Sequence, residues 1–462
     1  MPAPVYASLL DMIGSTPMLR LSRLDTGPCE LWVKMENQNP GQSIKDRIAL
    51  SMINAAEHDG RLKPGGRIFE ATAGNTGIAL ALVAAVRGYQ LTVVMPDKMS
   101  EEKVSHLRAM GATVIQTRSD VAKGHPEYYQ DLCERLAREA GGFYVNQFSN
   151  PANVEAHYTT TGPEIWEQMD GRVDAFVAGV GSGGTVAGIG RFLKESNPTC
   201  EIVLADPVGS ILTPLVNEGK RVDPGSWLVE GIGEDFVPDI LDLSIVDSAI
   251  AVSDEDAFRT VRDLLRTEAI LAGSSVGVLL AAALRYCRAQ TAPKRVVTII
   301  CDSGAKYLSK MYSDWWLHDQ GMLLRDRVGD LRDLIVRRHQ HREDFCLLPH
   351  VPLAQAIKRM QSSAVSQMAI VDESDRLVGV IDEFDILLSI TEDAAAARRT
   401  VGDVMVQDVQ TVLPSASVES ILPILRNDRV VLVADGGTYF GLITKMDLIQ
   451  HLRRTGATAS GH

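Results

Sequence analysis

Residues 1 to about 320 alternate short, β-branched runs with longer amphipathic stretches. The short runs have the length and composition of strands and lie at 31–35, 67–70, 91–95, 113–116, 173–178, 201–205 and 295–301. The longer stretches have helical spacing of apolar residues and include 76–88, 101–110, 126–140 and 185–195. This alternation predicts an α/β fold with a mainly parallel sheet, in which ligands bind beyond the carboxyl ends of the strands.

The pattern changes after Trp315-Trp316. Residues 321–345 are dense in Arg, Asp and His, which predicts a solvated linker and a first amphipathic helix. A repeat follows, because the pattern of residues 376–386 (RLVGVIDEFDI) recurs at residues 438–448 (TYFGLITKMDL). Val328-Gly329-Asp330 likewise resembles Val401-Gly402-Asp403. Such self-similarity indicates two copies of one supersecondary unit packed on each other.

Composition narrows the classes of function. The net charge of −13 argues against nucleic acid or an anionic membrane as partner, and no apolar run is long enough to cross a bilayer. The start, Met1-Pro2-Ala3-Pro4, lacks the basic and apolar regions of a secretory signal. The six cysteines are scattered without a C-x-x-C pair, so we expect free thiols in the cytoplasm rather than disulfides or a zinc site, and no metal.

The stretch Gly41–Ile48 carries the first candidate for chemistry. A Pro40-Gly41 turn precedes it, and Ser43 is suited to cap a new helix because its hydroxyl can accept from first-turn amides. Lys45 then lies in the first turn, where the positive end of the helix dipole disfavours a cation. A lowered pKa favours the neutral amine that a Schiff-base nucleophile needs. The alternative is an ordinary surface lysine.

Three loops follow predicted strands. Thr72–Gly77 offers glycines and helix amides to a carboxylate, and Gly179–Thr185 offers amides and hydroxyls to a phosphate at a helix start. The second loop contains a G-x-G-x-x-G, and Asp206 ends the next strand, so a nicotinamide-dependent dehydrogenase is an alternative. No Gly-Lys-Ser/Thr follows, which excludes a Walker A loop. The third loop, Cys301–Gly304, contains a serine that would ordinarily be a helix cap.

Taken together and in order, these motifs resemble the β-family (fold type II) of pyridoxal-phosphate enzymes, which includes cystathionine β-synthases and O-acetylserine sulfhydrylases. The resemblance covers residues 10–317 and outweighs the dinucleotide interpretation. It rests on Ile13–Pro17, Ser43–Arg47, Ala73–Gly77, Gln147–Pro151, Gly181–Thr185 and Asp302–Gly304. It implies a tryptophan synthase β-like fold of two α/β subdomains.

The resemblance also implies roles for single residues. Lys45 resembles the lysine that binds pyridoxal 5'-phosphate covalently and later moves the α-proton. Asn75 resembles the partner of the cofactor's ring hydroxyl, and Ser303 the partner of its pyridine nitrogen. The phosphate site would comprise Gly181, Ser182, Gly183, Gly184 and Thr185. The substrate carboxylate site would comprise Thr72, Ala73, Gly74, Thr76 and Gln147, with Ala73 in place of the usual serine.

Two loops differ in which substrate they favour. Trp227–Gly233, with Glu230 before Gly231-Ile232-Gly233, resembles the synthases, as does Asp206–Ser210. Gln147–Asn153 resembles the sulfhydrylases, and Glu234 replaces a tyrosine common in synthases. We expect Glu230 and Gly231 to contact substrate and the reaction to join L-serine and L-homocysteine into cystathionine and water. L-cysteine in place of serine would release hydrogen sulfide. O-acetylserine sulfhydrylase is the alternative. Because only 12 residues precede Ile13, no haem is expected.

The C-terminal copies resemble a pair of CBS domains, a Bateman module, which usually binds adenine-containing ligands. We expect a catalytic domain at 1–320, a linker at 321–328, and CBS domains at 329–395 and 396–457. The resemblance assigns ribose contacts to Asp385, Thr444 and Asp447. Asp382 replaces a hydroxyl residue, and its carboxylate would repel a polyphosphate but could bind ribose hydroxyls or the cationic S-adenosylmethionine. A module that only mediates assembly, and a non-catalytic nucleotide sensor, are the alternatives. Relatives dimerise, so we expect a homo-oligomer, either a dimer or a tetramer.

Overall fold

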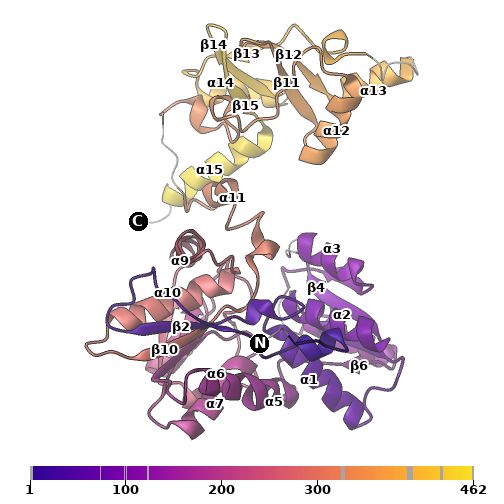
Figure 1. Cartoon of the computed structure of the whole chain (residues 1–462). Helices are drawn as coiled ribbons and strands as arrows, with labels where there is room; N and C mark the ends of the chain where they lie inside the picture. Colours follow the sequence, from indigo (N-terminus) through magenta and orange to yellow (C-terminus); the bar gives the residue numbers. More distant parts are fainter. Residues whose placement is uncertain are drawn as a thin grey trace. The chain divides into compact units, whose positions relative to one another are not determined.

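A computed structural model describes residues 4–72, 74–97, 99, 101–121, 124–323, 328–392, 399–426 and 430–459. The chain forms two compact units that divide between Ser313 and Asp314. The first unit contains two sheets and the helices that cover them, and the second contains the repeated elements (Figure 1).

The smaller sheet of the first unit is four-stranded and wholly parallel. Its order is β5 (Thr113–Thr117), β4 (Gln90–Pro96), β3 (Arg67–Ala71) and β6 (Phe143–Tyr144). Side chains of β3 alternate between its faces: Ile68 packs with α1 (Lys45–His58) and α2 (Asn75–Arg87), and Phe69 packs with α4 (Tyr129–Glu139). Both faces are therefore covered, as a parallel sheet requires.

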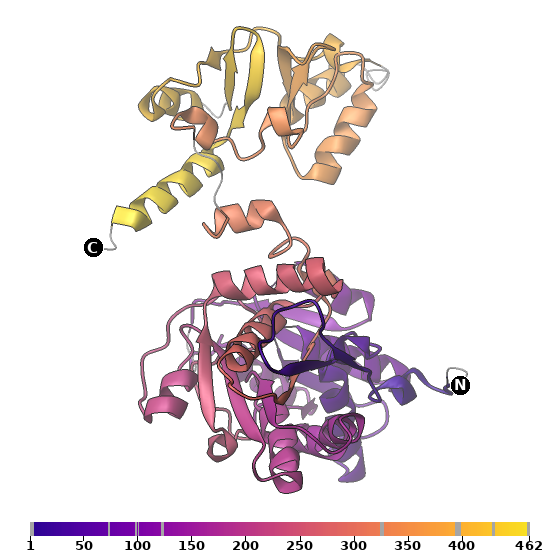
Figure 2. The same cartoon turned by 60° about the vertical axis from the view of Figure 1, so that its left-hand side comes forward.

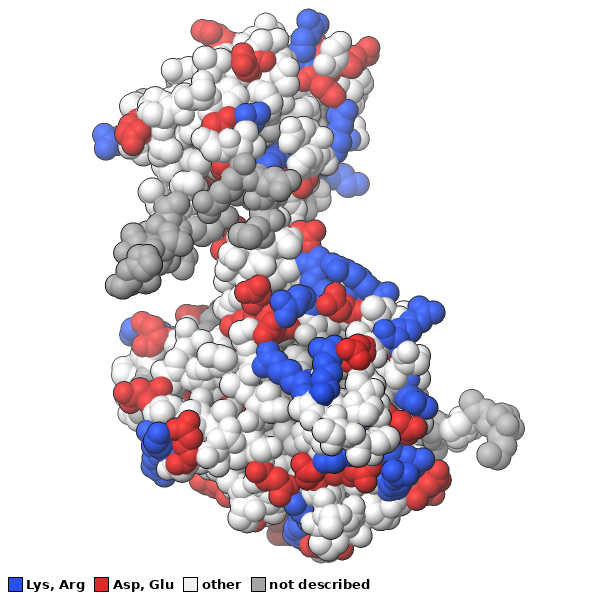
Figure 3. Space-filling view, turned by 90° about the vertical axis from the view of Figure 1, so that its left-hand side faces the viewer, with Lys and Arg blue, Asp and Glu red and all other residues white. Residues whose placement is uncertain are grey.

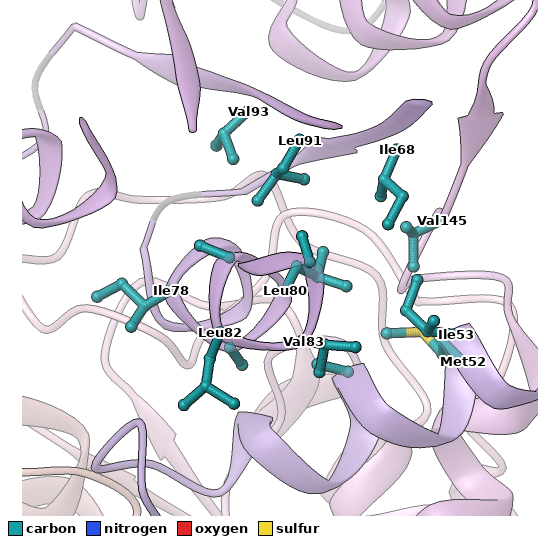
Figure 4. Packing of buried hydrophobic residues seen from close by; sticks show 14 of the residues in the cluster. Met52, Ile53, Ile68, Ile78, Leu80, Leu82, Val83, Leu91, Val93 and Val145 are labelled. Carbon is teal, nitrogen blue, oxygen red and sulfur yellow. The ribbon is translucent and has the colours of Figure 1, made fainter. Parts of the chain in front are cut away.

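Helix α2 is apolar on nearly every side because it lies at the centre of this packing. Ile78, Leu80 and Val83 are buried against β3, β4 and α1 (Figure 4). Each such side chain contributes about 1.5–3 kcal/mol by leaving water. The core thereby fixes the position of the first turn of α2, which carries Asn75 and Thr76.

The larger sheet has six strands, and only β1 is antiparallel. Its order is β1 (Met18–Arg20), β2 (Glu30–Lys34), β10 (Arg295–Ile299), β7 (Ala175–Ala178), β8 (Glu201–Pro207) and β9 (Ser248–Val252). Helices α9 (Asp254–Glu268) and α10 (Ser274–Arg288) lie on one side, and α6 (Gly162–Gln168) and α7 (Gly184–Ser196) lie on the other (Figure 1).

The predicted strands and helices of the first unit are confirmed, with bounds shifted by up to three residues. The predicted cap of α1 needs a small correction. The residue directly before this helix is Ile44, whose side chain cannot cap, and the Ser43 hydroxyl accepts from the Lys45 amide at 3.3 Å. The structure also has short helices that the sequence analysis did not predict, among them α5 (Pro151–Ala156) and the π-helical turn His157–Thr161.

The second unit confirms the repeat (Figure 2). In the first copy, α12 (Leu353–Ser363) precedes the hairpin β11 (Gln367–Val371) and β12 (Leu377–Asp382), and α13 (Glu383–Glu392) follows. The second copy consists of β13 (Thr411–Val412), α14 (Val418–Arg426), β14 (Val431–Asp435), β15 (Thr438–Ile443) and α15 (Lys445–Ala459).

Each copy is completed by a segment that precedes the other copy. Leu331, Leu334 and Ile335 are buried in the core of the second copy, with Ile421 and Val433 among their neighbours. The segment around Val401, in turn, is buried in the core of the first copy. The Leu331 amide also donates to the Pro414 carbonyl, and the Val401 amide to the Val351 carbonyl. We call residues 331–335 and 401–405 the crossing segments.

The expectation of an amphipathic helix within 321–345 is wrong for its described part, since residues 328–345 contain only the 3-10 helices η6 (Leu331–Asp333) and η7 (His339–His341). Residues 324–327 of the predicted linker lie outside the described residues. Asp330 accepts from the Arg332 amide, and Asp333 accepts from the amides of Val328 and Gly329. Such local bonds compete with helix formation.

In the part of the chain that the structure describes, no helix combines the length and apolarity that a membrane span needs. On the face drawn in Figure 3, Lys and Arg side chains lie among Asp and Glu side chains rather than in a separate basic region. That face therefore lacks the one-sided positive charge typical of nucleic-acid binding.

Candidate active site

A cavity of about 660 Å³ lies in the first unit, lined by loops that follow strands of both sheets. These loops follow β3, β6, β7 and β10. Together with the start of α1 and residues 224–236, they bring together most of the predicted site residues, which are Lys45, Thr72, Gly74, Asn75, Thr76, Gln147, Gly181, Ser182, Gly183, Thr185, Glu230 and Gly231. The three loops selected from the sequence thus converge on one cavity, as expected for the carboxyl ends of parallel strands.

Lys45 is the first residue of α1 and lines the cavity. Burial lowers the pKa of its amine, and the neighbouring Cys301 and Asp302 only partly oppose this effect. No described residue accepts a hydrogen bond from Nζ, so the amine is available to a ligand. The sequence analysis attributed a lowered pKa to the helix dipole, whereas the structure gives desolvation as the main cause.

The turn that carries Lys45 is held by a buried ionic network. Arg47 binds both carboxylate oxygens of Glu36, at 2.8 and 2.9 Å, and both of Glu164, at 2.7 Å each. Lys34 also binds Glu164, at 2.7 Å. The Ile13–Pro17 motif joins this network through the Ser15 amide, which donates to Glu164. Two motifs distant in the sequence are therefore fixed against each other.

The loop 181–185 leads into α7 and presents backbone amides at the helix start. Its glycines are required by close packing: a Cβ at position 184 would lie 2.0 Å from Asn153 Oδ1, and one at position 181 would lie 2.5 Å from the Gly231 carbonyl oxygen. Gly183 has a φ of +93°. Backbone amides presented in this way at a helix N-terminus are suited to bind an anion.

Two residues that the sequence analysis gave no role support this loop. Asn153 donates to Ser182 Oγ at 2.9 Å and to the Gln147 carbonyl at 2.8 Å, and so links the two sides of the cavity. His157 Nε2 lies 3.3 Å from Thr185 Oγ1. Burial and the nearby cations hold the pKa of His157 well below its usual value, so the imidazole is neutral. The only feature of the sequence that pointed to Asn153 and His157 was the helix start at Asn150-Pro151, which positions them.

The predicted carboxylate site is assembled around Gln147. Thr76 Oγ1 donates to Gln147 Oε1 at 2.8 Å, and the buried Glu70 accepts from the amides of Asn146 and Gln147 at 2.9 and 3.3 Å. Burial raises the pKa of Glu70 to about 8. Ala73 lies outside the described residues, so its predicted contact has no structural description.

Asn75 lies between two charged groups at the cavity wall. Its amide nitrogen donates to Asp302 at 2.8 Å, and its amide oxygen accepts from Lys306 at 2.8 Å. These contacts fix the orientation of the Asn75 amide. The resemblance predicts that this amide is the partner of the cofactor's ring hydroxyl.

Ser303 does not line the cavity, which corrects its predicted position. Its hydroxyl accepts from the Ala305 amide at 3.3 Å and caps the 3-10 helix Gly304–Tyr307, as a serine after a strand ordinarily does. The buried Ser275, in the first turn of α10, lines the cavity instead and lies beside Cys301. The sequence signal was a serine pair, Ser274-Ser275, at the start of an otherwise apolar helix.

Glu230 is paired with two cations that sequence reasoning missed. Lys103 and Lys310 both bind its carboxylate, and the three side chains line the cavity. Burial alone would raise the pKa of Glu230, but the two lysines lower it below its usual value. Glu234 also lines the cavity, and burial raises its pKa well above the usual value.

The predicted nucleotide-binding residues form two equivalent local pairs in the second unit. Thr444 Oγ1 donates to Asp447 Oδ2 at 2.8 Å at the start of α15. At the start of α13, the Asp385 amide donates to Asp382 Oδ1 at 2.8 Å, and the Asp382 amide donates back to Asp385 at 3.0 Å. Both pairs cap a helix.

The family model for "Pyridoxal-phosphate dependent enzyme" matches residues 9–302, and the CBS domain model matches residues 331–392 and 401–454. Cystathionine beta-synthase of Apis mellifera is 35% identical over 466 residues, covering 98% of this chain and 92% of the relative. Cystathionine beta-synthase of Oryctolagus cuniculus is 36% identical over 473 residues, covering 98% and 86%.

Two solved structures resemble the first unit. A hydrogen sulfide-producing enzyme from Fusobacterium nucleatum is 38% identical with a TM-score of 0.62, covering 66% of this chain and 100% of that chain. O-ureido-L-serine synthase is 36% identical with a TM-score of 0.62, covering 68% and 100%.

Proposed function

Because the chain belongs to the pyridoxal-phosphate-dependent enzymes, in the group represented by the cystathionine β-synthases, we propose that it joins L-serine and L-homocysteine into cystathionine and water. The observation that carries the proposal is the placement of Lys45 and Glu230 in one cavity, with the glycine loop between β7 and α7. Relatives named for this reaction match nearly the full length of the chain.

The cavity residues fit pyridoxal 5'-phosphate. The close-packed glycines at 181 and 184 leave backbone amides exposed to a phosphate. Burial lowers the pKa of the Lys45 amine, which makes no hydrogen bond to a described residue. Asn75 would face the ring hydroxyl. Ser275, rather than Ser303, would face the pyridine nitrogen, because only Ser275 lines the cavity. A neutral hydroxyl there does not enforce ring protonation, which favours loss of a β-substituent.

The bound cofactor supplies an electron sink for the bond from the substrate α-carbon to its proton. Thr72, Thr76 and Gln147 hold the substrate carboxylate. Lys45 Nζ, released on substrate binding, takes the α-proton and donates a proton to the departing β-hydroxyl. This acid is needed because hydroxide is a poor leaving group. The thiol then gives its proton to Lys45 Nζ as its sulfur bonds to the β-carbon, and Lys45 passes that proton to the α-carbon.

Glu230 is suited to recognise the second substrate. Because Lys103 and Lys310 keep its carboxylate ionised, it can accept a hydrogen bond from the ammonium group of homocysteine. The lysines offer cations to the carboxylate of the same amino acid. The Lys103–Glu230–Lys310 group thus matches the two opposite charges of an amino-acid thiol.

O-acetylserine sulfhydrylase remains the second candidate, because Gln147–Asn153 resembles that group and the solved relatives are named for different products. L-cysteine in place of serine would release hydrogen sulfide by the same steps. Steady-state rates with serine plus homocysteine, cysteine plus homocysteine, and O-acetylserine plus sulfide separate these functions. A rate with O-acetylserine plus sulfide that exceeds the rate with serine plus homocysteine would overturn the first proposal.

Borohydride reduction followed by peptide mapping tests the assignment of Lys45. The label should be found on Lys45 and be absent from Lys45→Ala, which should lose turnover. Label on another lysine would refute the assignment.

For the CBS pair we propose an adenine-containing ligand, S-adenosylmethionine or a nucleotide, at Thr444 and Asp447. Activity measured with and without each ligand tests this. A homo-oligomeric state and a cytoplasmic location, the latter favoured by six free cysteines, complete the proposal.

A further inference from the structure

Among the residues that the structure describes, one group of His, Cys and Asp has ligand atoms close enough to share a metal ion. It consists of His339, Asp344 and Cys346, whose ligand atoms all lie within 4.8 Å of one another. The group lies in the second unit, outside the cavity described above. Only four residues separate His339 from Asp344 and one separates Asp344 from Cys346, a spacing that matches no common zinc motif.

The three ligand atoms converge. His339 Nδ1 lies 3.0 Å from Asp344 Oδ2 and 3.6 Å from Cys346 Sγ, and the Cys346 thiol donates to Asp344 Oδ2 at 2.8 Å. The edges between ligands of a tetrahedral zinc ion are about 3.3–3.6 Å, from its bond lengths of about 2.0–2.3 Å. The imidazole–carboxylate and thiol–carboxylate edges must both lengthen, each by less than about 1 Å, when an ion replaces the thiol proton.

Two buried polar atoms around the group lack a partner. His339 is 6% exposed and Tyr439 is 2% exposed, yet His339 Nε2 and the Tyr439 hydroxyl make no hydrogen bond to any described residue. Their rings are 5.0 Å apart. Buried polar groups are normally paired, so this arrangement is incomplete as it stands.

The surroundings match those of a metal-bound histidine. Asp375 Oδ1 lies 3.8 Å from His339 Nε2, and Arg342 fixes Asp375 with contacts of 3.0 and 2.7 Å. Histidines that bind a metal through one ring nitrogen usually direct the other toward a carboxylate. With Nδ1 on an ion, His339 would carry its proton on Nε2 and turn it toward Asp375.

We propose that His339, Asp344 and Cys346 bind one zinc-like divalent ion, with the Tyr439 hydroxyl or a water in the fourth position. Mixed nitrogen, oxygen and sulfur ligands in tetrahedral geometry favour Zn²⁺. Binding releases the thiol proton of Cys346, so affinity rises with pH. The sequence analysis predicted free thiols and no metal, and the proposal revises that prediction for Cys346.

The position of the group gives the ion a structural effect. Residues 338–346 connect the first crossing segment, which packs in the second copy, to Leu347, which pairs with Ile370 of the first copy. Tyr439 belongs to β15 of the second copy. An ion at this point therefore ties the connection to both copies and should raise the unfolding temperature of the second unit.

Cobalt titration of the full-length holoenzyme, after chelator treatment and dialysis, tests the site. We expect one Co²⁺ per chain, with thiolate-to-cobalt charge transfer and d–d bands of tetrahedral cobalt, reversed by Zn²⁺. Cys346→Ser and His339→Gln should lose these bands. The matched controls Cys133→Ser and His341→Gln, the latter in the same short helix, should keep them. Asp375→Asn should weaken cobalt binding by about 10–100-fold.

A purely structural role predicts a different result. Cys346→Ser would then lower the unfolding temperature equally with and without Zn²⁺. The metal site predicts that Zn²⁺ raises the unfolding temperature of the parent and of His341→Gln, but not that of Cys346→Ser. Binding of no cobalt by the parent, or equal charge-transfer bands in parent and Cys346→Ser, would overturn the proposal. Turnover of the same samples confirms that the first unit is folded.

Discussion

Replacing Arg47 by methionine should strongly destabilise the first unit, because it removes the centre of the buried ionic network. The Arg47 side chain is 3% exposed and that of Glu36 is fully buried. Methionine preserves much of the side-chain length but leaves the Glu36 carboxylate with no guanidinium partner. It also removes the main contacts of Glu164, since Arg47 binds both of its oxygens.

The expected loss is about 3–5 kcal/mol, which is the cost of leaving one member of a buried ion pair without its partner. Domains are stable by only about 5–15 kcal/mol, so the change is large. Arg47→Lys should lose less, because it keeps the charge but cannot bind two carboxylates bidentately. Lys45 lies two residues before Arg47, at the start of α1, so cofactor retention should fall in parallel with stability.

Urea unfolding followed by tryptophan fluorescence, with cofactor absorbance as a second signal, measures the effect. Arg266→Met on the exposed surface of α9, paired with Asp263 at 3.4 Å, is the matched control and should change little. The difference between parent and Arg47→Met should also shrink in acid. Burial alone would raise the pKa of Glu164, but bonds from Arg47 and Lys34 hold it at about 2. This stabilisation is present above pH 4.5, the ordinary value, and is lost as pH falls toward about 2. Equal midpoints for Arg47→Met and Arg266→Met would refute the reasoning.

Other predictions concern the remaining buried groups. Burial raises the pKa of Glu70 from 4.5 to about 8, so the stability of the parent should fall as pH rises through that interval. Glu70→Gln should flatten the curve of stability against pH, and an unchanged slope would contradict this. Ser275→Ala should shift the cofactor absorbance and lower kcat, whereas Ser303→Ala should retain the parent spectrum; the reverse result would restore Ser303. Asp447→Asn should weaken adenine-ligand binding by about tenfold in calorimetry, the effect of one lost charged hydrogen bond of about 1.4 kcal/mol, and equal affinity would exclude that contact.

Local signals were enough to predict much of the first unit. Strand runs such as 91–95 (LTVVM) are rich in apolar and β-branched residues because β4 lies inside a sheet that is covered on both faces, and this composition is visible without the structure. The loops at 72–77 and 181–185 were found because glycines and hydroxyls at strand ends are unusual enough to be noticed. Both loops lie at carboxyl ends of strands, as expected, but they belong to different sheets, so their meeting in one cavity depends on the packing of the two sheets.

The features that the sequence analysis missed depend on contacts between residues far apart in the chain. Ser303 and Ser275 both stand at helix starts, and only the packing of α10 against the sheet places Ser275 in the cavity. Lys103 is 127 residues from Glu230, and no periodicity connects them. The helix predicted within 321–345 failed because the apolar residues of the first crossing segment belong to the core of the second copy.

Because of the crossing segments, each copy of the repeat contributes residues to the other's core, so the two copies are not independent domains. A protein that stops at residue 395 would lack Val401 and its neighbours, and would leave a hole in the copy it still contains. A fragment that starts at residue 396 would miss Leu331, Leu334 and Ile335 in the same way. We therefore expect neither half to fold by itself, and a ligand that destabilises one half should also destabilise the other.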